Sequence, residues 1–441
     1  MLLKKYIFIG CCLLLTTGVY AQYRTKTMDS NIRTLRMQYA ESGIVQRPFL
    51  VLQNGVVDGT DMQNTLDISF DEMSHDVHFY TYTLLHLNAD WTESNLSSTE
   101  YLSGFTTQDI TDYEHSLNTQ RAYTHYRFLF PNEDMQVRAS GNYALKIYED
   151  GNPDQVVAYV CFSVVEPRVG IGVEVRANTS IELNGRYQQL DLDINTSALQ
   201  LRDPNEIKVV IRQNGRIDNQ AVPSNPTYIE GQRLRYQNQR VLIFEGGNEY
   251  RHFDAYSVYF AGTGIDQIHF DHRDYHTFLF ADALRGVGAE WSGDVVTDKC
   301  GTPYMHEYDA DGQYLVNAER TYNADTEAEY MWVHWTLPAP NPWFDGTVYV
   351  GGELFQNHLG ADNRMQYDNE HRCYYLTQLV KQGGYDYQYW FVEKGNVSAT
   401  LQRTEGSHWQ TENEYTVCVY YRPFGGRYDQ IVGYQVVKST E

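Results

Sequence analysis

The chain is poor in cysteine, proline and basic residues. Its 441 residues include 6 Cys and 12 Pro, and 34 Lys and Arg stand against 57 Asp and Glu, a net charge of −23. So few basic residues argue against binding nucleic acid or an anionic lipid surface, because both need Lys and Arg opposite phosphates. With 42% hydrophobic residues, the composition is that of a folded chain and not of a disordered one.

Tyrosine is the residue in excess, with 37 Tyr against 18 Phe and 7 Trp. Tyr suits the half-buried face of a strand, because the ring packs while the hydroxyl reaches water. Strand-like segments at 143–147 and 156–165 flank the turn Asp150–Asn152, which predicts a β-hairpin. Asn214–Gly215 predicts a second hairpin turn. We therefore predict an all-β fold of antiparallel β-sandwiches, of the immunoglobulin-like or early-set-like kind.

The N-terminus has the pattern of a secretory signal peptide. Lys4–Lys5 precede an apolar core, Tyr6–Leu15, and Val19–Ala21 supplies small or tolerated residues before Gln22, where we expect cleavage. The apolar core is too short to span a bilayer. The alternative is a lipoprotein signal that ends at Gly10–Cys11. Cleavage before Gln22 leaves 32 basic against 57 acidic residues, a mature net charge of −25.

Two shifts in composition divide the mature chain into three predicted modules. Glu166–Pro167 follows the first hairpin, and the segment Gly286–Pro303 is rich in Gly and Asp. The modules are residues 22–166, 167–300 and 301–441. The last module holds five of the seven tryptophans, which are Trp332, Trp335, Trp343, Trp390 and Trp409.

Four cysteines remain after cleavage, namely Cys161, Cys300, Cys373 and Cys418. They form no Cys-x-x-Cys pair, so neither a zinc ribbon nor a thioredoxin-type site is indicated. We expect buried, inert thiols. A disulfide between Cys373 and Cys418 is the alternative that export would permit.

Candidate chemistry is sparse. His272, Asp274 and His276 would share one face of a strand, as metal ligands do, although such a cluster is more often a solvated strand edge. His86, Asn88 and Asp90 would share one strand face, as a carboxylate–histidine pair for acid–base chemistry would, but no nucleophile accompanies them and we expect structural hydrogen bonds. The chain has no motif of a serine hydrolase, a zinc peptidase, a P-loop or a dinucleotide site. We therefore predict no catalytic, metal or cofactor residues. The alternatives are glycan binding by exposed aromatic rings of the last module and a glycoside hydrolase with paired carboxylates.

A series of short segments resembles the plug protein family of the type IX secretion system, found in Bacteroidota. The segments follow the family order over nearly all of the mature chain: His86–Trp91, Glu100–Phe105, Ile110–Tyr113, Ser116–Thr119, Tyr123–Tyr126, Phe130–Asn132, Ser140–Tyr143, Gln213–Asn214, Phe244–Arg251, Leu379–Tyr387, Glu405–Gly406, Thr411–Tyr415, Tyr420–Arg422 and Asp429–Gly433. Two positions depart from the family pattern. Asn88 stands in place of a Cys, and Ile217 stands in place of an aromatic residue before Asp218.

The resemblance implies a non-enzymatic periplasmic protein without a cofactor. It would bind and occlude the periplasmic opening of a very large outer-membrane β-barrel translocon when no cargo carrier is engaged. The barrel would be its partner; we expect no nucleic acid, no insertion into the membrane, and a monomer outside the complex. Because aromatic residues dominate binding hot spots, we predict Trp91, Tyr101 and Phe105 as partner-binding residues, with core packing as the alternative.

Overall fold

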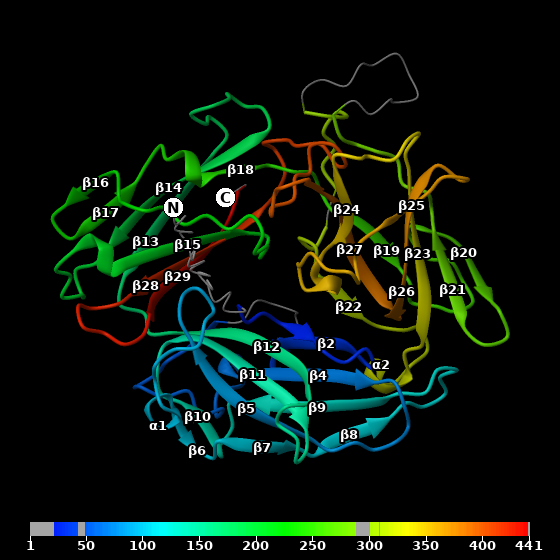
Figure 1. The fold of residues 1–441 in the computed structure, drawn as a ribbon, viewed down its shortest axis with the longest axis horizontal. Helices are drawn as coiled ribbons and strands as arrows, with labels where there is room; N and C mark the ends of the chain where they lie inside the picture. Colours follow the sequence, from blue (N-terminus) through cyan, green and yellow to red (C-terminus); the bar gives the residue numbers. More distant parts are fainter. Residues whose placement is uncertain (1–21, 43–48, 288–299, 308, 440–441) are drawn as a thin grey trace, which may run out of the picture.

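The computed structural model describes residues 22–42, 49–287, 300–307 and 309–439, and the predicted signal sequence lies outside them. Strands dominate the described residues and form three β-sandwiches around a common centre (Figure 1). The predicted all-β sandwich fold is therefore confirmed. Among the described residues, no helix has the length and apolar character needed to cross a membrane.

The N-terminal sandwich comprises residues 26–165 and lies at the bottom of Figure 1. Its first sheet consists, in order, of β1 (Lys26–Thr27), β12 (Val156–Val165), β11 (Gly141–Glu149), β5 (Tyr80–Leu87) and β7 (Thr107–Ile110), with β3 (Phe49–Val51) parallel to β12. The facing sheet consists of β2 (Ile32–Tyr39), β4 (Leu66–Glu72), β9 (Thr124–Phe130) and β8 (Asp112–His115). Helix α1 (Ser98–Tyr101) leads into a ribbon of β6 (Leu102–Gly104) and β10 (Met135–Val137).

The predicted first hairpin is confirmed as β11–β12. Tyr143, Leu145 and Ile147 of β11 are 0% exposed. They share the core with Phe70 and Tyr126 of the facing sheet. Removing one such side chain from water stabilises the fold by about 1.5–3 kcal/mol. The alternation in the sequence therefore reports the inner face of a packed sheet.

The middle sandwich combines residues 170–245 with residues 414–438. One sheet consists of β13 (Gly170–Arg176), β14 (Tyr187–Asn195), β17 (Arg233–Tyr236) and β16 (Tyr228–Glu230), with β18 (Ile243–Glu245) beside β14. The other consists of β15 (Ile207–Gln213), β28 (Glu414–Tyr421) and β29 (Gln430–Lys438).

The inserted sandwich comprises residues 251–393, between the two parts of the middle sandwich. One sheet consists of β19 (Arg251–Asp254), β27 (Gly383–Glu393) and β22 (Tyr314–Val316), with β24 (Gly346–Gly351) beside β27. The other consists of β20 (Ile265–Phe270), β21 (Tyr275–Leu279), β23 (Tyr330–Pro338), β26 (Cys373–Lys381) and β25 (Gln366–Asp368). The short helix α2 (Ala324–Glu327) precedes β23.

The sheets do not follow the predicted modules 167–300 and 301–441. Strands β19, β20 and β21 precede residue 300 but belong to the inserted sandwich, and β28 and β29 return to the middle sandwich. The return is fixed by the β15–β28 ladder, in which Val210 is opposite Cys418. A segment rich in turn residues indicates a loop but not a domain boundary. The sheet to which a strand belongs depends on the strand it pairs with, which can be distant in the sequence.

Candidate functional site: three junctions around a central cavity

The three predicted partner-binding residues lie in different surroundings. Trp91 is half-buried with a left-handed backbone (φ 61°), and the Arg212 guanidinium lies 5.5 Å from the centre of its ring. Tyr101 is 6% exposed and its hydroxyl donates to the Leu84 carbonyl at 2.9 Å. Phe105 is 63% exposed. Of the three, only Phe105 offers its ring to solvent, and partner contact at these residues stays a prediction.

The first junction joins the N-terminal and inserted sandwiches, and we call it the Asp71 junction. Asp71 on β4 is 1% exposed and accepts hydrogen bonds from Lys381 Nζ at 2.6 Å and from the Tyr330 hydroxyl at 2.7 Å. His125 Nδ1 lies 2.6 Å from the other carboxylate oxygen. Burial raises the pKa of Asp71, but the Lys381 ammonium and His125 outweigh it and hold that pKa at about 2. The Asp71 carboxylate is therefore ionised at neutral pH.

Further charged groups surround the Asp71 junction. Arg121 of the N-terminal sandwich forms a bidentate pair with Asp274, with Nη2–Oδ2 at 2.8 Å and Nε–Oδ1 at 3.2 Å. The Glu329 carboxylate accepts the backbone N–H groups of Gln120 and Arg121. A small apolar cluster that includes Tyr123 and Leu379 lies between these polar contacts. The contact is thus both ionic and apolar.

The second junction joins the middle and inserted sandwiches through the connecting segment 394–413, and we call it the Glu405 junction. Glu405 is 0% exposed, and its Oε2 lies 2.9 Å from Arg251 Nη2 and 2.7 Å from Arg285 Nη2. The Tyr389 backbone N–H donates to the other oxygen at 2.8 Å. Burial raises the pKa of Glu405, but Arg251 and Arg285 outweigh it and hold that pKa at about 2.

The same connecting segment bonds to the middle sandwich. The Ser407 hydroxyl donates to the Arg186 carbonyl at 2.5 Å, and Asn413 Nδ2 donates to the Gly246 carbonyl at 2.8 Å. Gly246 has no room for a side chain, because a Cβ there would lie 2.0 Å from the His408 carbonyl oxygen. The segment is therefore packed against both sandwiches.

The third junction joins the N-terminal and middle sandwiches, and we call it the Asp429 junction. Asp429 accepts the Ala89 backbone N–H at 2.9 Å and Arg422 Nε at 2.7 Å. Arg422 Nη2 also donates to Asn88 Oδ1 at 2.8 Å. Asn88, one of the departures from the family pattern, therefore supplies an acceptor to this contact. A buried apolar cluster that includes Val210 joins the two sandwiches beneath it.

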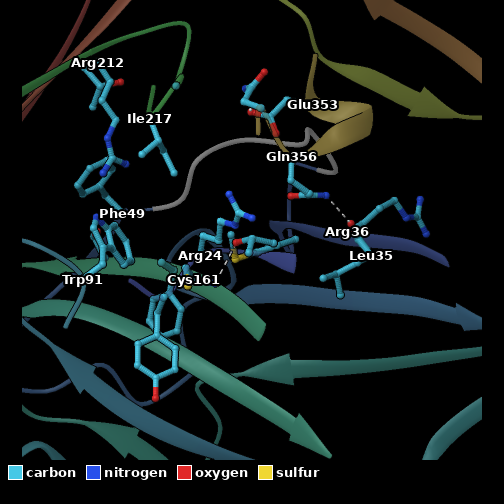
Figure 2. Close-up of a pocket in the computed structure, with 18 of the residues that line it drawn as sticks. Arg24, Leu35, Arg36, Phe49, Trp91, Cys161, Arg212, Ile217, Glu353 and Gln356 are labelled. Atoms are coloured by element: carbon cyan, nitrogen blue, oxygen red, sulfur yellow. Dashed lines mark hydrogen bonds between the residues drawn. The ribbon is translucent and has the colours of Figure 1, made fainter. Parts of the chain in front are cut away.

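All three sandwiches contribute to the lining of a cavity of about 130 Å³, which Figure 2 shows. Its lining includes Trp91 and Cys161 of the N-terminal sandwich, Arg212 of the middle sandwich and Gln356 of the inserted sandwich. Gln356 Nε2 donates to the Leu35 carbonyl at 3.0 Å and so bridges two sandwiches across the cavity. Burial raises the pKa of the Cys161 thiol, which disfavours the thiolate that a nucleophile needs. The cavity is thus the place where the three sandwiches meet.

The histidine and aspartate cluster forms structural contacts. Asp274 Oδ2 accepts from Arg121 at 2.8 Å and from Trp332 Nε1 at 3.3 Å. His276 Nδ1 lies 3.0 Å from His334 Nε2. Across the described residues, no group of three or more His, Cys, Asp or Glu side chains is arranged to hold a metal ion.

The cysteines and tryptophans bear on the remaining alternatives. Cys373 on β26 and Cys418 on β28 lie in different sandwiches, and no disulfide joins the four cysteines of the described chain. Burial raises the pKa of Cys418 to about 12. Of the five tryptophans in the predicted last module, Trp335 and Trp390 are fully buried and Trp409 is the exposed one, at 38%. A glycan platform of coplanar exposed tryptophans is therefore not formed by these five residues.

The junctions gather most of the segments that carry the family resemblance. Lys381, Glu405, Asn413 and Asp429 all belong to such segments. Asp71 does not, and sequence reasoning missed it. Polar residues alternate along β4, which is typical of a solvated face, yet every residue of this strand is buried. Asp71 can be recognised as a junction residue only in the folded structure, where the inserted sandwich covers β4.

Comparisons with known proteins agree with this architecture. A family model for the first domain of the type 9 secretion system plug protein matches residues 32–166. Ten chains of solved structures match. One of them is a hypothetical protein from Parabacteroides merdae that is 36% identical, covers 95% of this chain and 100% of its own, and has a TM-score of 0.87. No curated protein matches.

Proposed function

This chain belongs to the plug protein family of the type IX secretion system, and on that premise we propose that it binds and closes the periplasmic opening of a very large outer-membrane β-barrel translocon. Membership gives the chain a role in type IX secretion and a place in the cell envelope. The proposed role is non-enzymatic. It applies when no cargo carrier engages the translocon.

The observation that supports this proposal is the locking of three sandwiches into one body. A pore wide enough for folded cargo leaks unless its stopper is large and keeps its shape. Asp71 and Glu405 are at most 1% exposed and each pairs with a cationic side chain at its junction. Removing one partner of such a pair costs about 3–5 kcal/mol, because the remaining charge stays buried without compensation. Domains that meet through small polar surfaces usually move relative to one another. Here buried apolar clusters lie beside the charged pairs, and we infer that the sandwiches resist hinge motion.

The net charge of this chain indicates what charge the periplasmic rim of the translocon would carry. With a net charge of −25 after the predicted cleavage, the protein would associate fastest with a basic periplasmic rim, and salt would slow the association. Release must follow binding, so we expect a mixed polar and aromatic interface of modest size instead of an obligate apolar one.

Isolation of the tagged chain from gently solubilised outer membranes tests the proposal. Mass spectrometry should identify one very large β-barrel protein in a ratio near one to one. An unrelated periplasmic protein with the same tag controls for adhesion to detergent micelles. Recovery of the chain alone, with and without crosslinking, would contradict the proposal.

A further inference from the structure

A groove lies between the N-terminal and inserted sandwiches, beside the Asp71 junction, and we call it the Tyr259 groove. Its volume is about 350 Å³. Three loops form it: the β8–β9 loop, the β19–β20 loop and the segment between β22 and α2. Figure 1 shows the β8–β9 loop next to α2, below β20 and β21. The groove is lined by Asn118, Thr119, Gln120, Tyr256, Ser257, Val258, Tyr259, Phe260, Tyr275, Glu319, Arg320, Thr321, Glu327, Glu329 and Gln382.

The floor of the groove is fixed by hydrogen bonds. The Tyr256 carbonyl accepts the Glu319 backbone N–H at 2.8 Å and Gln382 Nε2 at 3.0 Å. The Glu329 backbone N–H donates to Gln382 Oε1 at 2.8 Å. The Glu329 carboxylate in turn holds the backbone of Gln120. The groove therefore exists only when the two sandwiches are joined.

The rim of the groove exposes aromatic rings. Tyr259 is 76% exposed and Phe260 is 63% exposed, and Tyr322, which follows the lining residue Thr321, is fully exposed. Leu117, on the β8–β9 loop that forms part of the groove, is 58% exposed. Single exposed apolar residues are ordinary, but a group of them around a hollow is typical of an interaction site.

The charges of the groove select its occupant. The lining residues include three acids, Glu319, Glu327 and the buried Glu329, and a single base, Arg320. The Glu327 carboxylate accepts the Tyr322 backbone N–H at 3.1 Å, and Glu319 lies exposed at the surface. Carboxylates next to aromatic faces favour a guanidinium or an ammonium group, which pairs with the acid and stacks on the ring.

We propose that the Tyr259 groove receives a lysine- or arginine-bearing periplasmic loop of the translocon. This inference rests on the proposed function and names the surface through which the plug docks. The cation would lie between Glu319 and the Tyr259 and Phe260 rings, and the remaining loop would cover the aromatic rim. Because both sandwiches contribute to the groove, only the locked body presents it.

The test uses the full tagged chain carrying a photo-crosslinking amino acid in place of Tyr259. Phe344 is the control position, because it is 87% exposed on the same sandwich and does not line the groove. We expect the substituted Tyr259 position to crosslink to the large β-barrel protein and the substituted Phe344 position not to. A crosslink to a second copy of this chain, or crosslinks from the control position alone, would overturn the inference.

Binding to the solubilised barrel provides a second readout. The double substitution Tyr259→Ser with Phe260→Ser should weaken binding at least about tenfold, as loss of hot-spot aromatics does, while Phe344→Ser should not. Glu319→Gln should slow association and reduce its salt dependence. Glu133→Gln, an exposed acid beyond the far end of β9, is the matched control.

The outcomes separate the inference from the proposed function. If the wild-type chain binds the barrel and the double variant binds equally well, the groove is not the docking surface although the plug proposal stands. If the wild-type chain itself fails to bind, both are wrong. Unchanged unfolding temperatures of the exposed-residue variants would show that weaker binding is not due to misfolding.

Discussion

Lys381 Nζ lies 2.6 Å from Asp71 Oδ2, and both side chains are at most 1% exposed. Lys381 is the last residue of β26 in the inserted sandwich, and Asp71 lies on β4 in the N-terminal sandwich. Two charges buried in this way persist only as a pair, because each alone would lose its hydration without compensation. Removing either partner should therefore destabilise the contact between the two sandwiches.

Replacing Lys381 with Met tests this pair. The substitution leaves the Asp71 carboxylate buried with less compensation, and we expect the free energy of unfolding to fall by about 3–5 kcal/mol. Lys438→Met is the matched control, since Lys438 pairs with Glu412 at 2.5 Å but is 44% exposed, and exposed pairs contribute at most about 1 kcal/mol. Denaturant unfolding measures both variants. Equal losses would contradict the account of the junction.

Acid should loosen the junctions. The pKa of Asp71 and that of Glu405 are held at about 2 in the folded chain, below the ordinary values of about 4. Groups with a depressed pKa add stability above the unfolded value, and this contribution is lost as the pH falls from about 4 to about 2. The unfolding temperature should therefore drop steeply in that range. Asp71→Asn should be less stable than wild type at pH 7 and should approach it near pH 2; a constant difference would contradict the assignment.

Asp309 should show the opposite dependence on pH. Burial, with Asp386 and Glu249 nearby, raises the pKa of Asp309 to about 7. A raised pKa means that the folded chain holds the proton more tightly, so the contribution to stability declines as the pH rises from about 4 to about 7. Asp309→Asn removes this decline. The unfolding temperature of the variant relative to wild type should rise across that interval and level off above it, whereas a flat difference would show that Asp309 titrates normally.

A methyl group at Gly246 tests the packing of the connecting segment. Gly246→Ala places Cβ 2.0 Å from the His408 carbonyl oxygen, so the Glu405 junction must shift. We expect a loss of about 1–3 kcal/mol in the free energy of unfolding, as overpacked sites show. Gly170→Ala is the control, because a Cβ there meets its nearest neighbour, Asn195 Cβ, at 3.7 Å. If both variants unfold alike, the segment is less tightly packed than the structure indicates.

The local fold was predictable from the sequence, and the long-range pairing was not. Alternation identified β11 and β12 as a hairpin because their partners are adjacent in the chain. The same reasoning could not join β15 to β28, since alternation reports an inward face and not the identity of the strand opposite. The C-terminal strands were therefore assigned to the predicted last module, although they complete the middle sandwich.

The site shows the same limit. The segments that resemble the family include Ala89 and Asp429, which meet through a hydrogen bond of 2.9 Å across the Asp429 junction. Nothing in either segment points to the other. Tyr101, predicted as a partner-binding residue with core packing as the alternative, is buried and bonded to the Leu84 carbonyl, and its contact with a partner stays a prediction. A hydrophobic side chain is suited both to the core and to an interface, and only the folded structure shows which of the two a given residue occupies.

The most direct test of closure is the leak of a folded protein through the translocon. Proteoliposomes containing the purified barrel and a trapped fluorescent folded protein should release it when the pore is open. Addition of this chain to the periplasmic face should stop the release at about one chain per barrel, while an unrelated acidic periplasmic protein should leave the release unchanged. If the chain binds the barrel and the trapped protein still escapes at the same rate, the protein is a partner of the translocon but does not plug it.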